Sequence, residues 1–312
     1  MDISDIKEEL IVKIVSETEN YLQDKRIPVI LTLISLFSGG HLLIEDLPGV
    51  GKTTLAIAIA KIFGFTFGRI QCTPDLLPSD ITGINIFSNK KSVFEFRKGP
   101  IFNNMVLIDE INRTTQKTQS AFLEAMEEEQ VTIDTKTFPL PTPFFVIATQ
   151  NPTEHYGTFP LPDSQMDRFI MNISIGYPDR NSELDILKTG SIRKNLSYIK
   201  PVLRQEDFFE IIKKISSIYA SEKALNYIVD IVNSTRNNKY IITGISPRGS
   251  LALLSCAKTF AYFKSRDYIT FDDIKQLAPY TLSHRIILKE EYSSLKKRDI
   301  IEEIVRDIDI PV

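Results

Sequence analysis

The sequence predicts an α/β core, in which a parallel sheet is covered by helices, followed by a smaller all-helical domain. Three observations predict this fold. A glycine-rich segment at 46–54 stands between an apolar run and a helix-forming stretch. Short, continuous apolar runs recur at 105–108 and 144–148, as in strands that are buried on both faces. Toward the C-terminus, apolar residues recur at helical spacing instead, so we expect the core over 1–180 and the helical domain over 181–312.

The first part of the core predicts a phosphate-binding loop. We expect helix up to residue 37, a buried strand at 41–45 and a helix at 55–60, with Gly-Lys-Thr at 51–53 between the last two. In such a loop backbone N–H groups and the helix dipole bind phosphate, the lysine reaches the β and γ oxygens, and the hydroxyl ligates Mg²⁺. The predicted nucleotide-binding residues of this segment are Asp46, Pro48, Gly49, Val50, Gly51, Lys52, Thr53 and Thr54.

The strict form of this motif has glycine where this chain has Asp46. Aspartate tolerates the left-handed backbone region better than most residues, and it bonds its own neighbours in turns. We therefore expect the loop to form with aspartate at this position.

Polar side chains follow the next two predicted strands. Asp109 and Glu110 end the run at 105–108, where Asp109 is expected to hold the water shell of Mg²⁺ and Glu110 to polarise the attacking water. Asn151 follows the run at 144–148, where it would bond the γ-phosphate or that water. Between them, apolar residues within 115–130 indicate a helix.

The second domain reads as a small helical bundle. Thr270 to Asp273 resembles a capping box, and Pro247 is well placed for a first turn. Four segments carry apolar residues at helical spacing: 207–220, 222–233, 247–263 and 272–280.

Composition and charge argue against a nucleic-acid-binding protein and against a membrane-anchored one. The net charge is -3 and the sequence pI is about 5.8, which gives no basic footprint for nucleic acid. The longest apolar stretch, at 27–37, is shorter than the roughly 20 residues that span a bilayer, and no signal peptide precedes it, so we expect no membrane anchor. Two isolated cysteines, Cys72 and Cys256, favour a reducing cytoplasm.

Together these motifs resemble the MoxR branch of the AAA+ ATPases, over nearly the whole chain. The matching segments lie at 47–54, 106–113, 124–128, 148–152, 161–169 and 244–248. The resemblance implies a P-loop NTPase core with an αβα architecture and a helical lid. It implies ATP and Mg²⁺ as cofactors, and a ring that is usually hexameric. Aspartate at position 46 is usual in that branch.

The resemblance also implies roles for single residues. Segment 149–151 would be sensor 1, Arg168 an arginine finger that acts in trans, and Arg248 sensor 2, while Arg113 is a further candidate to act across subunits. Hairpin insertions are expected within 84–102 and 131–138. Partners of this branch typically carry a von Willebrand factor A domain with a metal-ion-dependent adhesion site.

We therefore expect an ATPase that remodels, matures or activates partner proteins. One alternative is a nucleic-acid motor related to helicases, against which the acidic pI stands. A second alternative, a monomeric kinase or GTPase switch, would not explain Arg168 and Arg248. Against a third, a scaffold that does not hydrolyse nucleotide, stands the presence of every expected catalytic side chain. Glutamates 127 to 129 crowd the C-terminal end of one helix, where their charge opposes the helix dipole. Either a basic residue of a neighbouring subunit compensates them, or they form a solvated surface.

Overall fold

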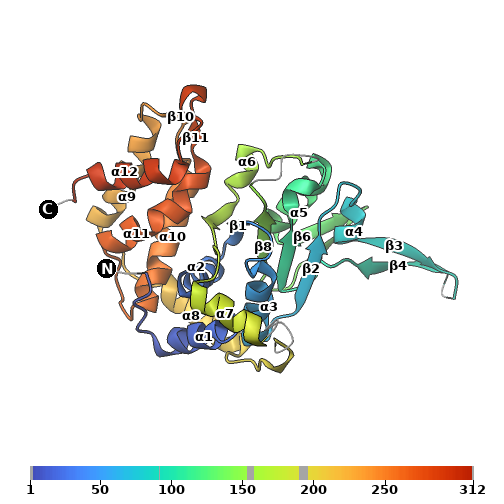
Figure 1. The fold of residues 1–312 in the computed structure, drawn as a ribbon. Helices are drawn as coiled ribbons and strands as arrows, with labels where there is room; N and C mark the ends of the chain where they lie inside the picture. The colour runs from blue at the N-terminus through green and yellow to red at the C-terminus, as the bar shows by residue number, and fades with distance from the viewer. Residues whose placement is uncertain (1–2, 91, 153–157, 190–195, 311–312) are drawn as a thin grey trace. The chain divides into compact units, whose positions relative to one another are not determined.

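The computed structural model describes residues 3–90, 92–152, 158–189 and 196–310 (Figure 1). The chain forms two compact units. Unit 1 comprises Met1–Leu42, Phe169–Ile173 and Leu203–Val312, and unit 2 comprises Leu43–Arg168 and Ser174–Val202. The expected domain boundary at residue 180 stays a prediction. Among the described residues, none of the helices has the length and apolar character to cross a membrane.

A five-stranded sheet is the centre of the α/β fold. Its strands stand in the order β2-β5-β8-β1-β9, and they are β1 (His41–Glu45), β2 (Phe67–Gln71), β5 (Met105–Asp109), β8 (Phe145–Gln150) and β9 (Phe169–Ile173). β2, β5 and β8 are parallel, with Phe67, Met105 and Phe145 in register. Every residue of β5 is buried, as the continuous apolar run predicted. The parallel sheet is therefore confirmed, with its strand ends at one edge.

Unit 2 carries the remaining elements of the core. They are α3 (Lys52–Ile62), α4 (Pro78–Thr82), η1 (Ile111–Arg113), α5 (Gln116–Glu128), α6 (Asp163–Met166), α7 (Arg180–Thr189), and two hairpins, β3–β4 (Gly83–Ser88 and Val93–Lys98) and β6–β7 (Gln130–Ile133 and Lys136–Pro139). The Thr115 hydroxyl accepts a hydrogen bond from the Thr118 N–H and so caps α5. Both hairpins lie where the sequence predicted insertions, and β3–β4 extends away from the sheet strands of unit 2 (Figure 1).

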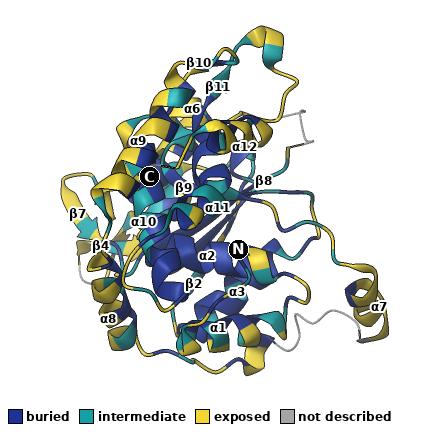
Figure 2. Cartoon of the chain, turned by 90° about the vertical axis from the view of Figure 1, so that its left-hand side faces the viewer, coloured by how far each residue is buried: buried dark blue, intermediate teal, exposed yellow. Residues whose placement is uncertain are grey.

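Unit 1 is largely helical. Its elements besides β9 are α1 (Glu9–Glu19), α2 (Arg26–Phe37), α8 (Gln205–Ser216), α9 (Glu222–Arg236), α10 (Pro247–Phe263), α11 (Phe271–Leu282), α12 (Lys297–Asp307), the short helices η3 (Ser283–Arg285) and η4 (Glu290–Tyr292), and the pair β10 (Ile241–Thr243) and β11 (Ile287–Leu288). α2 is buried from Pro28 to its end, as its dark colour in Figure 2 shows. The Phe37 ring stacks on Phe208 at 5.0 Å and meets the edge of Phe263, so aromatic packing joins α2, α8 and α10.

Candidate active site

The phosphate loop has the backbone that its glycines predict. Gly49 and Gly51 have φ angles of 89° and 102°, a left-handed region that side chains with a Cβ rarely occupy. Gly51 is directly followed by the first turn of α3, which begins at Lys52. The Lys52 side chain is nearly buried and its Nζ donates to the Asp46 carbonyl at 2.7 Å. Burial lowers the pKa of Lys52, and the carboxylates of Asp46, Asp109 and Glu110 partly oppose that effect.

Asp46 adopts a role that the loop motif alone does not indicate. Its Oδ2 accepts hydrogen bonds from the Ser174 hydroxyl (2.9 Å) and from the N–H groups of Ile175 and Gly176 (2.7 Å each). Its Oδ1 accepts from the Leu47 N–H at 2.8 Å. Of the two properties expected to let aspartate stand here, left-handed tolerance is not used, because Asp46 is not among the described residues with positive φ, whereas the bond to a neighbour is present at Leu47. The aspartate instead ties the loop to the segment after β9.

The two acidic residues lie where β5 ends, beside β8. The Thr149 hydroxyl donates to Asp109 Oδ1 at 2.8 Å and accepts from the Glu110 N–H at 2.9 Å, so one threonine positions both. Glu110 has φ 61° and ψ 54°, a left-handed conformation that begins η1. Arg113 Nη1 lies 3.0 Å from Glu110 Oε2. Arg113 is thus held at Glu110 of its own chain.

The phosphate loop and the ends of β5 and β8 surround a pocket of about 220 Å³. Of the predicted site residues, those that line it are Pro48, Gly49, Gly51, Lys52, Thr53, Asp109, Glu110 and Asn151. Asp46, Val50 and Thr54 are buried and do not line it. Carboxylate and hydroxyl oxygens beside a lysine and a helix N-terminus can bind a triphosphate with its divalent cation. The sequence-predicted loop and the strand-end carboxylates therefore converge on a single cavity.

Two lining residues, Arg69 and Gln71, were not predicted. Arg69 Nη2 lies 2.7 Å from Asp109 Oδ2 and donates to Gln71 Oε1 at 2.9 Å, while Gln71 Nε2 donates to Glu110 Oε2 at 3.2 Å. Both residues lie on β2, two positions apart, so their side chains share one face of the strand. That alternation of polar residues could have identified them had the strand itself been recognised.

The two arginines implied by resemblance lie in different units. Arg168 Nη1 donates to the Leu123 carbonyl at 3.0 Å, and the same atom forms an ion pair with Glu127. An arginine of the same chain therefore compensates part of the negative charge at the C-terminal end of α5. The sequence alone suggested a basic residue of a neighbouring subunit for this role. Arg248 lies in the first turn of α10, in unit 1.

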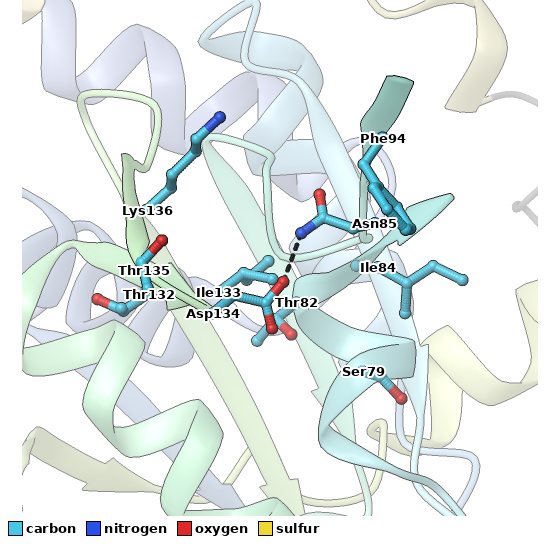
Figure 3. A pocket seen from close by; sticks show the side chains of 11 residues that line it. Ser79, Thr82, Ile84, Asn85, Phe94, Thr132, Ile133, Asp134, Thr135 and Lys136 are labelled. Atoms are coloured by element: carbon cyan, nitrogen blue, oxygen red, sulfur yellow. Dashed lines mark hydrogen bonds between the residues drawn. The ribbon is translucent and has the colours of Figure 1, made fainter. Parts of the chain in front are cut away.

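A second pocket of unit 2 lies between the hairpins (Figure 3). It has a volume of about 660 Å³ and is lined by residues of α4, β3–β4 and β6–β7. The Asn85 amide donates to Asp134 Oδ2 at 2.7 Å across it, and the Phe96 and Phe138 rings stack at 4.3 Å. These contacts join the two hairpins to each other. The β3–β4 hairpin carries large apolar side chains whose exposed fractions run from 41% to 71%: Ile84, Ile86, Phe87, Val93 and Phe94.

Comparison with known proteins adds the family. Residues 41–171 match the family described as "ATPase family associated with various cellular activities (AAA)", and residues 233–304 match an AAA lid domain. The chain is 36% identical over 290 residues to "Chaperone MoxR1" of Mycobacterium tuberculosis, covering 89% of this chain and 76% of that one. "Protein MoxR" of Methylorubrum extorquens is 25% identical, with 89% and 87% covered.

Two further relatives cover almost the full length. "Uncharacterized protein YeaC" of Bacillus subtilis is 46% identical over 305 residues, which are 97% of this chain and 95% of that protein. A crystal structure of a presumed ATPase from Cytophaga hutchinsonii superimposes with a TM-score of 0.89 at 40% identity, covering 97% and 95% of the two chains. With a phosphate loop, strand-end carboxylates and a lid match in one chain, this protein belongs to the MoxR family of AAA+ ATPases.

Proposed function

We propose that this chain assembles as a ring, most simply a hexamer, and uses ATP hydrolysis to remodel, mature or activate a partner protein. The observation that carries the proposal is the 220 Å³ pocket that joins Lys52, Asp109 and Glu110. Hydrolysis needs a cation at the phosphates and a carboxylate at the attacking water, and this pocket offers both.

The oxygen donors of the pocket fit Mg²⁺. The Thr53 hydroxyl and the Asp109 carboxylate would hold it, Asp109 through water, and both line the pocket. Bound there with ATP, Mg²⁺ would neutralise charge on the β and γ oxygens. Lys52 binds the same oxygens, Glu110 orients the water and accepts its proton, and Asn151 bonds the γ-phosphate or that water.

Two variants separate binding from turnover. Lys52→Ala should lose ATP binding because the β and γ oxygens lose their lysine, whereas Glu110→Gln should bind ATP and fail to hydrolyse it. Isothermal titration with ATP and a phosphate-release assay measure the two steps. Glu206→Gln, an exposed glutamate on α8, is the matched control and should behave as wild type. Turnover by Glu110→Gln at the wild-type rate would remove Glu110 from the proposed mechanism.

We further propose that Arg168 completes the site of a neighbouring subunit and that Arg248 couples lid position to nucleotide. An arginine that stabilises charge on the γ-phosphate contributes roughly 10³ to 10⁵ in turnover, and ground-state binding needs it far less. Arg168→Ala should therefore keep ATP affinity and lose most hydrolysis. For Arg248→Ala, distance measurements between labelled units with and without a non-hydrolysable ATP analogue should show less closure than in wild type; equal closure would contradict the coupling.

The partner is proposed to be a protein with a von Willebrand factor A domain. The exposed apolar side chains of β3–β4 support a protein-binding role, because such a cluster on one hairpin is a common mark of an interaction site. Capture of such a protein by Glu110→Gln in ATP should weaken when Phe94→Ser is added, and should not weaken with Tyr198→Ser, whose side chain is also more than 70% exposed. Equal capture by both variants would contradict the hairpin's part in binding.

The alternative of a nucleic-acid motor is not favoured by the relatives, which carry chaperone and MoxR names. Salt-dependent binding of single- or double-stranded DNA would favour it over a protein partner. We also propose a cytoplasmic location, which the two free cysteines suit.

A further inference from the structure

Arg69 forms an ion pair with Asp109, the carboxylate that is proposed to hold the metal. Its Nη2 lies 2.7 Å from Asp109 Oδ2, while the Thr149 hydroxyl takes Asp109 Oδ1 at 2.8 Å. Both oxygens of Asp109 are therefore engaged by groups of the same chain. The Arg69 side chain is 46% exposed, against 13% for Asp109, and it lines the pocket, so the arginine has solvent into which it can swing while the aspartate is buried.

The register between β2 and β5 brings Arg69 and Asp109 together. β2 and β5 are parallel, with Arg69 opposite Leu107 and Gln71 opposite Asp109. The Arg69 side chain therefore reaches the strand end from a position one pleat earlier, and Gln71 Oε1 accepts from the same Nη2 at 2.9 Å. Arg69 is held at Asp109 by two partners and lines the same cavity as Lys52 and Thr53.

A guanidinium on Asp109 Oδ2 and a divalent cation held through water at the same carboxylate would be like charges at close range, and they would repel each other. We propose that Arg69 is the resident cation of Asp109 in the nucleotide-free protein, and that it leaves Asp109 when Mg²⁺ enters with the nucleotide. Arg69 is then a positioning residue: it keeps Asp109 neutralised and oriented, and it sets the Mg²⁺ concentration at which the site fills. The inference rests on the proposed role of Asp109 in holding the metal.

The test measures metal binding without turnover. A fluorescent N-methylanthraniloyl derivative of ADP is held at saturating concentration with the full chain, and Mg²⁺ is titrated to find the concentration at half-maximal signal. Arg69→Ala should lower this midpoint about three- to tenfold, the fold-change that corresponds to one charge-assisted hydrogen bond at a half-exposed site. Arg69→Lys, which keeps a cation, should restore the midpoint toward wild type. Arg97→Ala, which removes an exposed arginine of β4, should leave it unchanged.

A double-variant cycle separates competition from a structural effect. Asp109→Asn should raise the Mg²⁺ midpoint, and adding Arg69→Ala to it should change nothing further, because the carboxylate for which arginine and metal compete is gone. An unchanged or raised midpoint in Arg69→Ala, or a lowering that persists in the Asp109→Asn background, overturns the exchange.

Two controls complete the design. If Asp109→Asn leaves the midpoint unchanged, the metal assignment of the proposed function fails and the exchange fails with it, whereas a failure of the Arg69 arm alone leaves that assignment standing. Thermal unfolding of each variant reports folding. If Arg69→Ala does not fold, Arg69→Gln replaces it, because its neutral amide keeps much of the side chain while removing the charge, and the same lowered midpoint is expected.

Discussion

At the scale of single residues, Asp46 shows how one side chain connects distant parts of unit 2. Its carboxylate accepts hydrogen bonds from Leu47, Ser174, Ile175 and Gly176, and its carbonyl accepts the Lys52 ammonium. Burial alone would raise the pKa of Asp46, but these hydrogen bonds to the charged form together lower it. The position that glycine fills in the strict motif is here a charged anchor for the loop.

The charge of Asp46 predicts a pH-dependent stability. Because its pKa is lower in the folded chain, the ionised carboxylate stabilises the fold above the unfolded pKa, and this contribution is lost as the pH falls through the folded pKa. Asp46→Asn should therefore lower the free energy of unfolding by about 1.5–3 kcal/mol at pH 7, and the difference should shrink as the pH falls below about 4. Urea unfolding at several pH values measures it, with the exposed Asp230→Asn as control. A pH-independent difference would contradict the electrostatic account.

The two thiols give a second prediction at this scale. Burial, followed by the nearby charges of Asp109 and Glu110, raises the pKa of Cys72 to about 12, and burial raises that of Cys256 to about 12. Because the thiolate is the reactive form, both should stay protonated and unreactive in the folded protein at pH 8. A disulfide reagent should release little colour until denaturant is added. Fast reaction of either thiol in the native protein would show that it is more accessible than its burial indicates.

At the scale of elements, α11 shows a capping box that the sequence predicted. The Thr270 hydroxyl accepts from the Asp273 N–H, and Asp273 Oδ2 accepts from the Thr270 N–H at 2.8 Å. Arg266 adds two further bonds, from Nη1 at 2.9 Å and Nη2 at 2.6 Å, to a carboxylate that is fully buried. Asp273 thus starts the helix and also balances a nearly buried guanidinium.

Removing the Asp273 carboxylate should therefore lower the free energy of unfolding by more than the loss of an ordinary helix cap does. Asp273→Ala is expected to lower the free energy of unfolding by about 3–5 kcal/mol, because it leaves Arg266 without its buried partner, while Thr270→Ala should cost about 1 kcal/mol. Asp272→Ala, an exposed change in the same turn, is the control. Chemical unfolding measures all three, and equal losses in Asp273→Ala and Asp272→Ala would contradict the account.

How far the sequence predicts an element depends on whether its signals are local. α10 was predicted at its observed bounds, 247–263, because Pro247 favours a first turn and the apolar spacing is regular. β2 was missed because Phe67–Gln71 is short and carries polar residues at alternate positions, which a buried strand need not show. Arg69 and Gln71 were missed with it, and α12 was missed although its apolar residues are well spaced.

In the candidate site too, the features with local sequence signals were predicted and the long-range contacts were not. The loop and the strand-end carboxylates follow from motifs a few residues long, so they could be predicted and lie in one pocket. The bonds of Asp46 to Ser174–Gly176 join residues about 130 positions apart, and the ion pair of Arg168 with Glu127 depends on how α6 and α5 fold, so neither could be read from local spacing.

At the scale of the whole molecule, the proposed mechanism requires active sites that two subunits share. Arg168 lies in unit 2, between α6 and β9 along the chain, where Glu127 and the Leu123 carbonyl hold it. Both of these contacts use Nη1, and a guanidinium has N–H donors beyond that atom. We therefore propose above all that an arginine from a second copy of this chain completes hydrolysis.

Mixing two inactive variants tests this claim most directly. Arg168→Ala lacks the finger and Lys52→Ala lacks the nucleotide site, so each should be inactive alone. In mixed assemblies some interfaces pair an intact Arg168 with an intact Lys52 site, and phosphate release should rise well above the sum of the separate variants, with a maximum near equal amounts. Fluorescence transfer between labelled subunits verifies that they exchange. Phosphate release no greater than that sum, in assemblies shown to be mixed, would contradict a shared active site.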